Sequence, residues 1–221
     1  MEKLNVVQQV SIWLLPILFA VTMHEAAHGW VAFKLGDDTA FRAGRITANP
    51  FKHIDLIGTI IVPILLLVTT GFIFGWAKPV PVDGNRLRHP KRDLALVALA
   101  GPLSNFLMAF IWMGFVKLGI LLLQKKIAMG IPLVLMSEAG VMINLFLMVL
   151  NLIPIPPLDG SRVVSSFLPK PFDSYYDKIS AYGFIIILIL LMTNIIPKIM
   201  LPPVLFLKSM LQIIFQINFQ V

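Results

Sequence analysis

Long apolar runs separated by short polar segments dominate the chain. Residues 4–23, 56–77, 94–116, 139–158 and 179–197 contain no Lys, Arg, Asp or Glu, and residues 199–221 contain a single charged residue, Lys208. A helix that spans a bilayer needs about 20 predominantly apolar residues, so each run is long enough to cross. The pattern predicts an all-α polytopic membrane protein with about five to six transmembrane helices. We expect the first helix to continue to about Lys34.

Composition agrees with this pattern and narrows the class of protein. Of the 221 residues, 58% are hydrophobic and 13% are charged, whereas soluble domains are about 25% charged. No loop is long enough for a soluble domain, so we expect residues 1–221 to form one membrane domain. The chain has no cysteine, which excludes disulfides and thiolate metal ligands. The net charge of +7 is expected to come from basic loops beside a membrane, and no nucleic-acid partner is expected.

A polar cluster, HEAAH at residues 24–28, lies within the first predicted helix. Ionisable side chains are costly at membrane depth and therefore usually mark function. Residues i and i+4 of an α-helix share a face, so His24 and His28 can bind one metal ion, and Glu25 lies beside that face. This is the H-E-x-x-H arrangement of zinc metalloproteases. The structural alternative is two histidines that form hydrogen bonds between helices.

A catalytic zinc site usually has three protein ligands and an open fourth position, so the chain should supply one more. His53 and His89 lie among basic residues in polar loops, and Glu138 is expected to open a helix, where a carboxylate suits the helix dipole. Asp159 follows a run broken by prolines. Irregular backbone at membrane depth is tolerated only where it lines protein or a water-filled cavity. Asp159 is therefore the predicted third ligand, and the alternative is that it only caps the next helix.

Four stretches of the chain resemble the site-2 protease family of intramembrane zinc metalloproteases, peptidase family M50. They are HEAAH at 24–28, AGPLSN at 100–105, NLIPIPPLDG at 151–160, and FGWAKPVPVD at 74–83, which looks like the family's membrane-dipping segment. The resemblance implies one Zn²⁺ per chain, with His24, His28 and Asp159 as ligands and Glu25 as the catalytic base.

The resemblance also implies residues that contact the substrate. Asn151 is expected near the site, where it helps to hold the substrate. Asn105 is a second candidate, with an interhelical hydrogen bond as the alternative. Pro79, Val80 and Pro81 are expected to offer a strand edge that keeps the substrate extended.

The implied activity is hydrolysis of peptide bonds within or near transmembrane segments of other membrane proteins, in regulated intramembrane proteolysis. The implied partners are such a substrate and the lipid bilayer. The rival function is that of a non-proteolytic zinc-binding membrane protein or a metal transporter. A transporter should carry polar residues along a whole path, and a pseudoenzyme would usually have lost Glu25. We expect the catalytic core at about residues 9–165 and C-terminal hydrophobic helices at about 178–221.

The positions of the expected ligands constrain the topology. The two histidines lie in the second half of the first helix, and Asp159 follows the far end of another helix. These two helices must therefore run parallel, which requires an odd number of crossings between them. Of the two apolar runs between them, residues 56–77 contain a proline and several glycines. We expect this run to re-enter the membrane as an extended or β segment near the active site.

The distribution of basic residues favours the same topology, because cytoplasmic loops are enriched in Lys and Arg. If residues 56–77 re-enter, twelve basic residues share one face and four lie on the other; if the run crosses, the split is nine to seven. The twelve are Lys34, Arg42, Arg45, Lys52, Lys78, Arg86, Arg88, Lys91, Arg92, Arg162, Lys170 and Lys178, and the four are Lys3, Lys125, Lys126 and Lys198. We expect a multi-pass protein of a prokaryotic cell membrane, with its active site toward the cytoplasm.

Overall fold

The computed structural model describes residues 5–62, 65, 77–169 and 172–217, and these residues form helices and connecting loops without a β-strand. This confirms the predicted all-α class for the described part of the chain. The helices are α1 (Val6–Lys34), α2 (Thr39–Arg42), η1 (Pro50–Lys52), η2 (Leu56–Ile61), η3 (Gly84–Arg86), α4 (Pro90–Gln124), α5 (Gly130–Leu152), α6 (Asp159–Phe167), α7 (Phe172–Met192) and α8 (Ile195–Ile214).

Helix α1 carries the histidine pair and begins at a well-formed cap. The Asn5 side chain accepts a hydrogen bond from Gln8 N at 2.8 Å, and the Gln8 side chain accepts one from Asn5 N at 2.9 Å. This reciprocal capping box satisfies amide groups that the first helical turn leaves without partners. The helix then continues through residues 24–28 to Lys34, as the sequence predicts.

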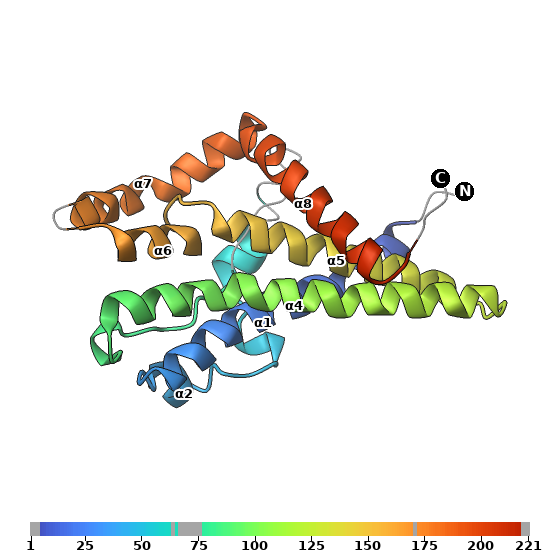
Figure 1. Ribbon diagram of the computed structural model, residues 1–221, viewed down its shortest axis with the longest axis horizontal. Coiled ribbons are helices and arrows are strands. Elements are labelled where there is room, and N and C mark those ends of the chain that lie inside the picture. The colour runs from blue at the N-terminus through green and yellow to red at the C-terminus, as the bar shows by residue number, and fades with distance from the viewer. Residues whose placement is uncertain (1–4, 63–64, 66–76, 170–171, 218–221) are drawn as a thin grey trace.

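Helices α1, α4 and α5 pack together and position the site. Helices α4 and α5 are antiparallel neighbours, and their close approach depends on Gly140, because a Cβ atom there would lie 2.4 Å from the Trp112 ring. Figure 1 shows α1 and α5 running in the same direction, as the sequence argument requires. A buried cluster that includes Met113, Val141 and Leu145 holds α4 and α5 together, with Val204 of α8 added to it.

Four of the described helices are long and apolar enough to cross a membrane: α1, α4, α5 and α8. The expected number of five to six transmembrane helices is not confirmed by this count, which covers only the described residues. Helices α7 and α8 meet at Asn194, which has a left-handed φ of 56°. In Figure 1, α7 rises to this turn and α8 descends from it, and α8 ends near the end of the molecule where α1 begins.

Two predicted helix boundaries are wrong. Glu138 does not open a helix, because α5 already begins at Gly130. Its carboxylate instead accepts a hydrogen bond from Lys208 of α8 at 2.6 Å. Lys198 separates the apolar runs 179–197 and 199–221 in the sequence, but α8 already begins at Ile195 and includes it. Glu138 lies well inside α5, and Lys198 lies in the first turn of α8.

Most of the predicted re-entrant run lies outside the described residues. At its start, Leu56–Ile61 forms the short π-helical turn η2, and Asp55 accepts a hydrogen bond from Gly58 N. The backbone N–H of Lys78 donates to His53 O at 2.9 Å, so the residues flanking the two ends of the run are neighbours in space. Residues 77–83 have no regular secondary structure, so the expected extended or β segment is not confirmed.

Candidate metal centre and active site

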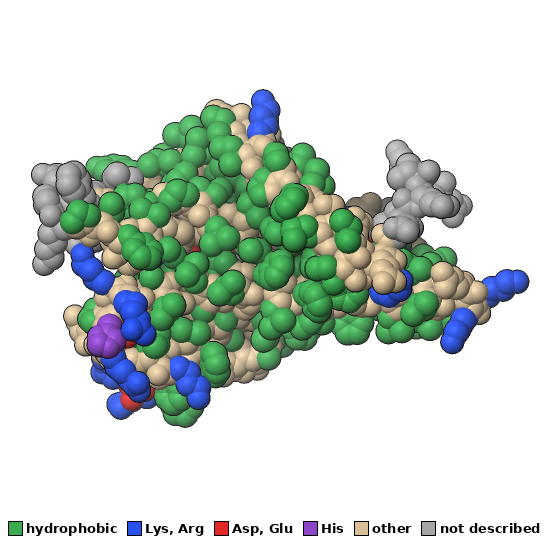
Figure 2. Space-filling view, viewed as in Figure 1, with side chains coloured by type: hydrophobic (Ala, Val, Ile, Leu, Met, Phe, Trp, Pro, Cys, Tyr) green, Lys and Arg blue, Asp and Glu red, His purple; other side chains and the backbone are tan. Residues whose placement is uncertain are grey.

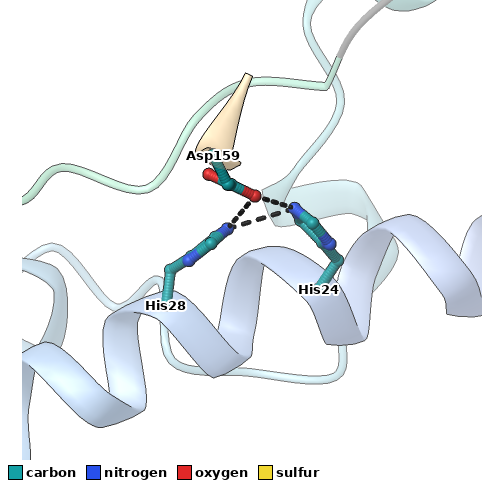
Figure 3. A group of neighbouring side chains, drawn as sticks. All are labelled: His24, His28 and Asp159. Carbon is teal, nitrogen blue, oxygen red and sulfur yellow. Dashed lines mark hydrogen bonds and ion pairs between the residues drawn. The ribbon is translucent and has the colours of Figure 1, made fainter. Parts of the chain in front are cut away.

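Three side chains meet where α6 begins beside α1 (Figure 3). Asp159 Oδ2 lies 3.1 Å from His24 Nε2 and 3.2 Å from His28 Nε2, and the two Nε2 atoms are 3.1 Å apart. His24 and His28 are 7% and 9% exposed, and the Asp159 side chain is 13% exposed. The structure therefore brings together all three predicted ligands in one nearly buried group.

The hydrogen bonds of the two histidines decide which ring nitrogens face this group. His28 Nδ1 lies 2.7 Å from the backbone carbonyl of Val97, which can only accept, so Nδ1 carries the proton and donates it. His24 Nδ1 lies 2.6 Å from Asn105 Oδ1 and donates to it in the same way. Both Nε2 atoms then direct lone pairs toward a carboxylate oxygen. Three electron-pair donors that converge in this way suit a cation placed between them.

The arrangement fits zinc. Ligand nitrogen and oxygen atoms lie about 2.0–2.2 Å from Zn²⁺, which places two ligands of a tetrahedral site about 3.3–3.6 Å apart. The distances of 3.1–3.2 Å between the donor atoms are close to this spacing. Asp159 Oδ2 is buried and receives no hydrogen bond within the described structure, as expected for an atom whose partner is a metal. The side chains of His24, His28 and Asp159 could therefore hold one metal ion, and their spacing fits zinc.

Helix α4 runs directly against this site at Gly101. A Cβ atom at Gly101 would lie 2.4 Å from His28 Nε2 and 2.5 Å from His24 Cε1. Only a residue without a side chain can occupy this position while both imidazole rings keep their places. The sequence contains Gly101 in the AGPLSN stretch, but nothing in the pattern assigned it a role.

The loop between α5 and α6 positions Asp159 at the site. Helix α5 ends at Leu152, and Asp159 is the first residue of α6. The residue at the cap position of α6 is Leu158, and no side chain caps the helix, so the interpretation of Asp159 as a simple cap is wrong. Helix α7 holds the same loop: the Tyr176 hydroxyl donates to Pro154 O, and Gly183 packs against the backbone of Pro156.

Glu25 lies beside the ligands, where a catalytic base is expected. It is partly exposed, and its Oε2 accepts a hydrogen bond of 2.9 Å from Val80 N. Val80 is 8% exposed, whereas Pro79 and Pro81 on either side are exposed. The predicted substrate-binding segment therefore contacts the predicted catalytic base directly.

The two asparagine candidates lie in different surroundings. Asn151 is partly buried near the end of α5, and its Nδ2 donates to Leu147 O at 3.0 Å, one turn earlier in the same helix. Asn105 is fully buried and forms the hydrogen bond to His24 already described. A substrate role for Asn151 stays a prediction, and Asn105 contacts a metal ligand through the interhelical hydrogen bond considered as its alternative.

Side chains at the end of α1 anchor the segment that contains Val80. The buried Asp37 carboxylate accepts hydrogen bonds from Thr39 N, the Thr39 hydroxyl and Asp83 N. Burial alone raises the pKa of Asp37, but these hydrogen bonds and the nearby Arg86 charge outweigh it and lower the pKa overall. Asp37 is therefore ionised at neutral pH and holds residue 83 against the end of α1.

His53 lies outside the group of three ligand candidates and forms a hydrogen bond within its own loop. It is 2% exposed, and its Nε2 donates to Thr47 O at 3.1 Å. Burial lowers the pKa of His53, and the Arg45 charge lowers it further. Its backbone carbonyl accepts from Lys78 N, as described above, so the His53 loop supports the segment that leads to Val80.

Comparisons with known proteins agree with this geometry. The model of the family described as peptidase family M50 matches residues 12–192. YwhC of Bacillus subtilis, provisionally named a zinc metalloprotease, is 38% identical over 188 residues, which cover 81% of this chain and 80% of YwhC. Rip2 of Mycolicibacterium smegmatis, with the same provisional name, is 26% identical over 200 residues, or 87% of this chain and 72% of Rip2. No solved structure matches the chain significantly.

Proposed function

The chain belongs to peptidase family M50, and from this membership and the site geometry we propose that it is an intramembrane zinc metalloprotease of the site-2 type. We propose as its substrates the transmembrane segments of other membrane proteins, cut within or near the membrane. The observation that carries the proposal is the group formed by His24, His28 and Asp159, with Glu25 beside it, on helices apolar enough to span a membrane.

The residues of the site have separate chemical roles. When bound, zinc supplies a Lewis acid for the scissile carbonyl and lowers the pKa of a water molecule toward about 7. Glu25 accepts the proton of the attacking water and passes it to the leaving amine nitrogen. Val80 N–H holds the Glu25 carboxylate at its position beside α1 before substrate arrives.

The segment around Val80 supports an extended substrate. In an extended chain, the N–H and C=O groups of one residue point to the same edge, and those of its neighbours point to the other. Val80 N faces Glu25, so an extended segment would direct the carbonyl groups of Pro79 and Pro81 away from α1, and neither proline has an N–H to donate. This edge offers acceptors to the N–H groups of an unwound substrate and offers no donors at either proline.

The distribution of charge supports a cytoplasmic active site. Exposed basic side chains gather at the end of the molecule that carries α2 and the start of α4, as Figure 2 shows, and include Arg42, Arg88, Lys91 and Arg92. Loops on the cytoplasmic side of membrane proteins carry such an excess of Lys and Arg. We propose that this end faces the cytoplasm of a prokaryotic cell.

A zinc carrier is the rival function, and two variants separate it from a protease. Each is co-expressed with single-span membrane proteins, and cleaved fragments and bound zinc are measured. We expect Glu25→Gln to keep its zinc and to lose cleavage, because only the catalytic base is removed. We expect Asp159→Asn to lose most of its zinc and all cleavage, because an amide does not supply the negative charge that the ion requires.

The outcomes that would contradict the proposal are specific. Cleavage by Glu25→Gln at the wild-type rate excludes Glu25 as the base. Full zinc content and activity in Asp159→Asn exclude the three-ligand site. His53→Ala is the matched control: it removes another buried histidine outside the site, and its zinc content should equal that of the wild type.

A further inference from the structure

Two buried asparagines connect the metal site to the backbones of neighbouring helices. Asn105 of α4 and Asn144 of α5 are both fully buried. Asn105 Oδ1 accepts from His24 Nδ1 at 2.6 Å, and Asn105 Nδ2 donates to Ala20 O at 3.1 Å and to Asn144 Oδ1 at 3.0 Å. Asn144 Nδ2 donates to Gly140 O at 2.8 Å. The resulting chain of hydrogen bonds joins α1, α4 and α5.

Two backbone carbonyls, which can only accept hydrogen bonds, fix the donor-to-acceptor direction of these hydrogen bonds. Because Asn144 faces Gly140 O with one amide atom, that atom must be Nδ2, and Oδ1 must face Asn105. Because Asn105 faces Ala20 O, the amide atom there must also be nitrogen, and the oxygen is left for His24. Turning either amide over would place two acceptors against each other.

The Asn105 oxygen atom beside His24 Nδ1 determines which tautomer His24 adopts. A neutral imidazole carries one proton, and an acceptor beside Nδ1 favours the tautomer that carries the proton there. Nε2 is then left with a lone pair directed toward Asp159. Partners of this kind, outside the ligands themselves, fix the ring orientation and the tautomer of metal-bound histidines. For His28 the backbone carbonyl of Val97 is the acceptor that fixes the tautomer. For His24 the acceptor is the Asn105 side chain, whose own orientation must be fixed by other hydrogen bonds.

We propose that Asn105 and Asn144 are positioning residues that set the tautomer and orientation of His24, and through it the affinity for zinc. Asn105 acts directly on His24, and Asn144 acts only through Asn105. Both Nδ2 hydrogens of Asn105 have acceptors inside the protein, and its oxygen accepts from His24. The proposal rests on the zinc site and does not depend on the nature of the substrate.

The test measures zinc affinity of the full chain in detergent by competition with a chelator. The variants are Asn105→Leu, Asn144→Leu and the double variant, since leucine has a similar size and no polar side-chain atom. We expect Asn105→Leu to weaken zinc binding about 10–100-fold. We expect Asn144→Leu to weaken it about two- to tenfold, the effect of one hydrogen bond. The double variant should bind no more weakly than Asn105→Leu, because Asn144 acts through Asn105.

Ser137→Ala is the matched control. Ser137 is fully buried on the same helix as Asn144, and its hydroxyl has no hydrogen-bond partner within the described structure. Its zinc affinity should equal that of the wild type. If both asparagine variants bind zinc as the wild type does, the proposal is wrong. It is also wrong if their effects add in the double variant, as two independent packing defects would. Should Asn105→Leu not fold, equal zinc affinities of Asn144→Leu and Ser137→Ala would overturn the proposal.

Discussion

Gly101 shows how little room the metal site leaves for the helix beside it. A helical glycine costs about 0.5–1 kcal/mol relative to alanine, so the position is unfavourable for α4 taken alone. Its function is to let the α4 backbone lie against both imidazole rings, where a Cβ atom would approach His28 Nε2 to 2.4 Å. The close approach also brings Val97 O and Asn105 within reach of the histidines.

Gly101→Ala tests this interpretation. We expect the added methyl group to displace the rings of His24 and His28 and to reduce zinc binding by more than about tenfold, although alanine favours the helix. Zinc content and thermal unfolding of the purified protein are the measurements. Gly114→Ala, in the same helix, is the control, because its Cβ would lie 3.4 Å from the nearest atom of Phe215. Normal zinc binding by Gly101→Ala would show that the site does not require the close approach.

Single residues differ in how far the sequence reveals them. His24, Glu25 and His28 are predictable because their spacing on one helix places them together, and because their polarity stands out in an apolar run. Gly101 and Asn144 are not, because their roles depend on which faces of α4 and α5 meet α1. The sequence does contain a signal for Asn144, a polar residue in the apolar run 139–158. Polarity alone does not tell which partner such a residue has.

Helix α7 acts on the metal site through the loop that precedes Asp159. Gly183 packs so closely that a Cβ atom there would lie 1.9 Å from Pro156 O. The Tyr176 hydroxyl donates to Pro154 O in the same loop. Helix α7 therefore supports the position of Asp159 although it supplies no ligand.

Gly183→Ala should separate α7 from this loop and shift Asp159. We expect weaker zinc binding and slower cleavage, with the other ligands in place on α1. Zinc titration and a cleavage assay on the same preparation are the measurements. Ile185→Ala is the control, because Ile185 lies on the same helix and is 55% exposed. Equal zinc affinity in both variants would show that α7 does not position Asp159.

At the level of elements, the sequence predicts the existence of helices better than their ends. A charged residue predicts the end of a helix because a lone charge is costly in an apolar environment. Glu138 and Lys208 remove that cost by pairing across α5 and α8, so both lie within helices. Such a pair joins residues 70 positions apart, and no local pattern reveals it. The turn at Asn194, four residues before Lys198, is likewise not marked by a proline or glycine at that point.

For the whole molecule, the parallel arrangement of α1 and α5 follows from the need to bring residues 24, 28 and 159 together. With α4 crossing between them, the sequence argument predicts that the run 56–77 returns to the side from which it starts, and most of this run lies outside the described residues. The neighbouring positions of His53 and Lys78 support this, since Lys78 N donates to His53 O and Arg45 donates to Lys78 O. The pattern of apolar residues alone does not predict such contacts between residues far apart in the sequence.

Labelling of introduced cysteines tests the topology, and the chain suits it because it has no cysteine of its own. Lys52→Cys and Arg88→Cys place exposed thiols on either side of the run 56–77, and Lys125→Cys places one at the turn between α4 and α5. With a membrane-impermeant maleimide on intact cells, we expect Lys125→Cys to react and the other two to react only after permeabilisation. Different behaviour of Lys52→Cys and Arg88→Cys would mean that the run crosses the membrane. If Lys52→Cys and Arg88→Cys both react on intact cells and Lys125→Cys does not, the run re-enters but the zinc site faces the outside of the cell. The reason is that His24, His28 and the loop containing Lys52 lie at the same end of α1.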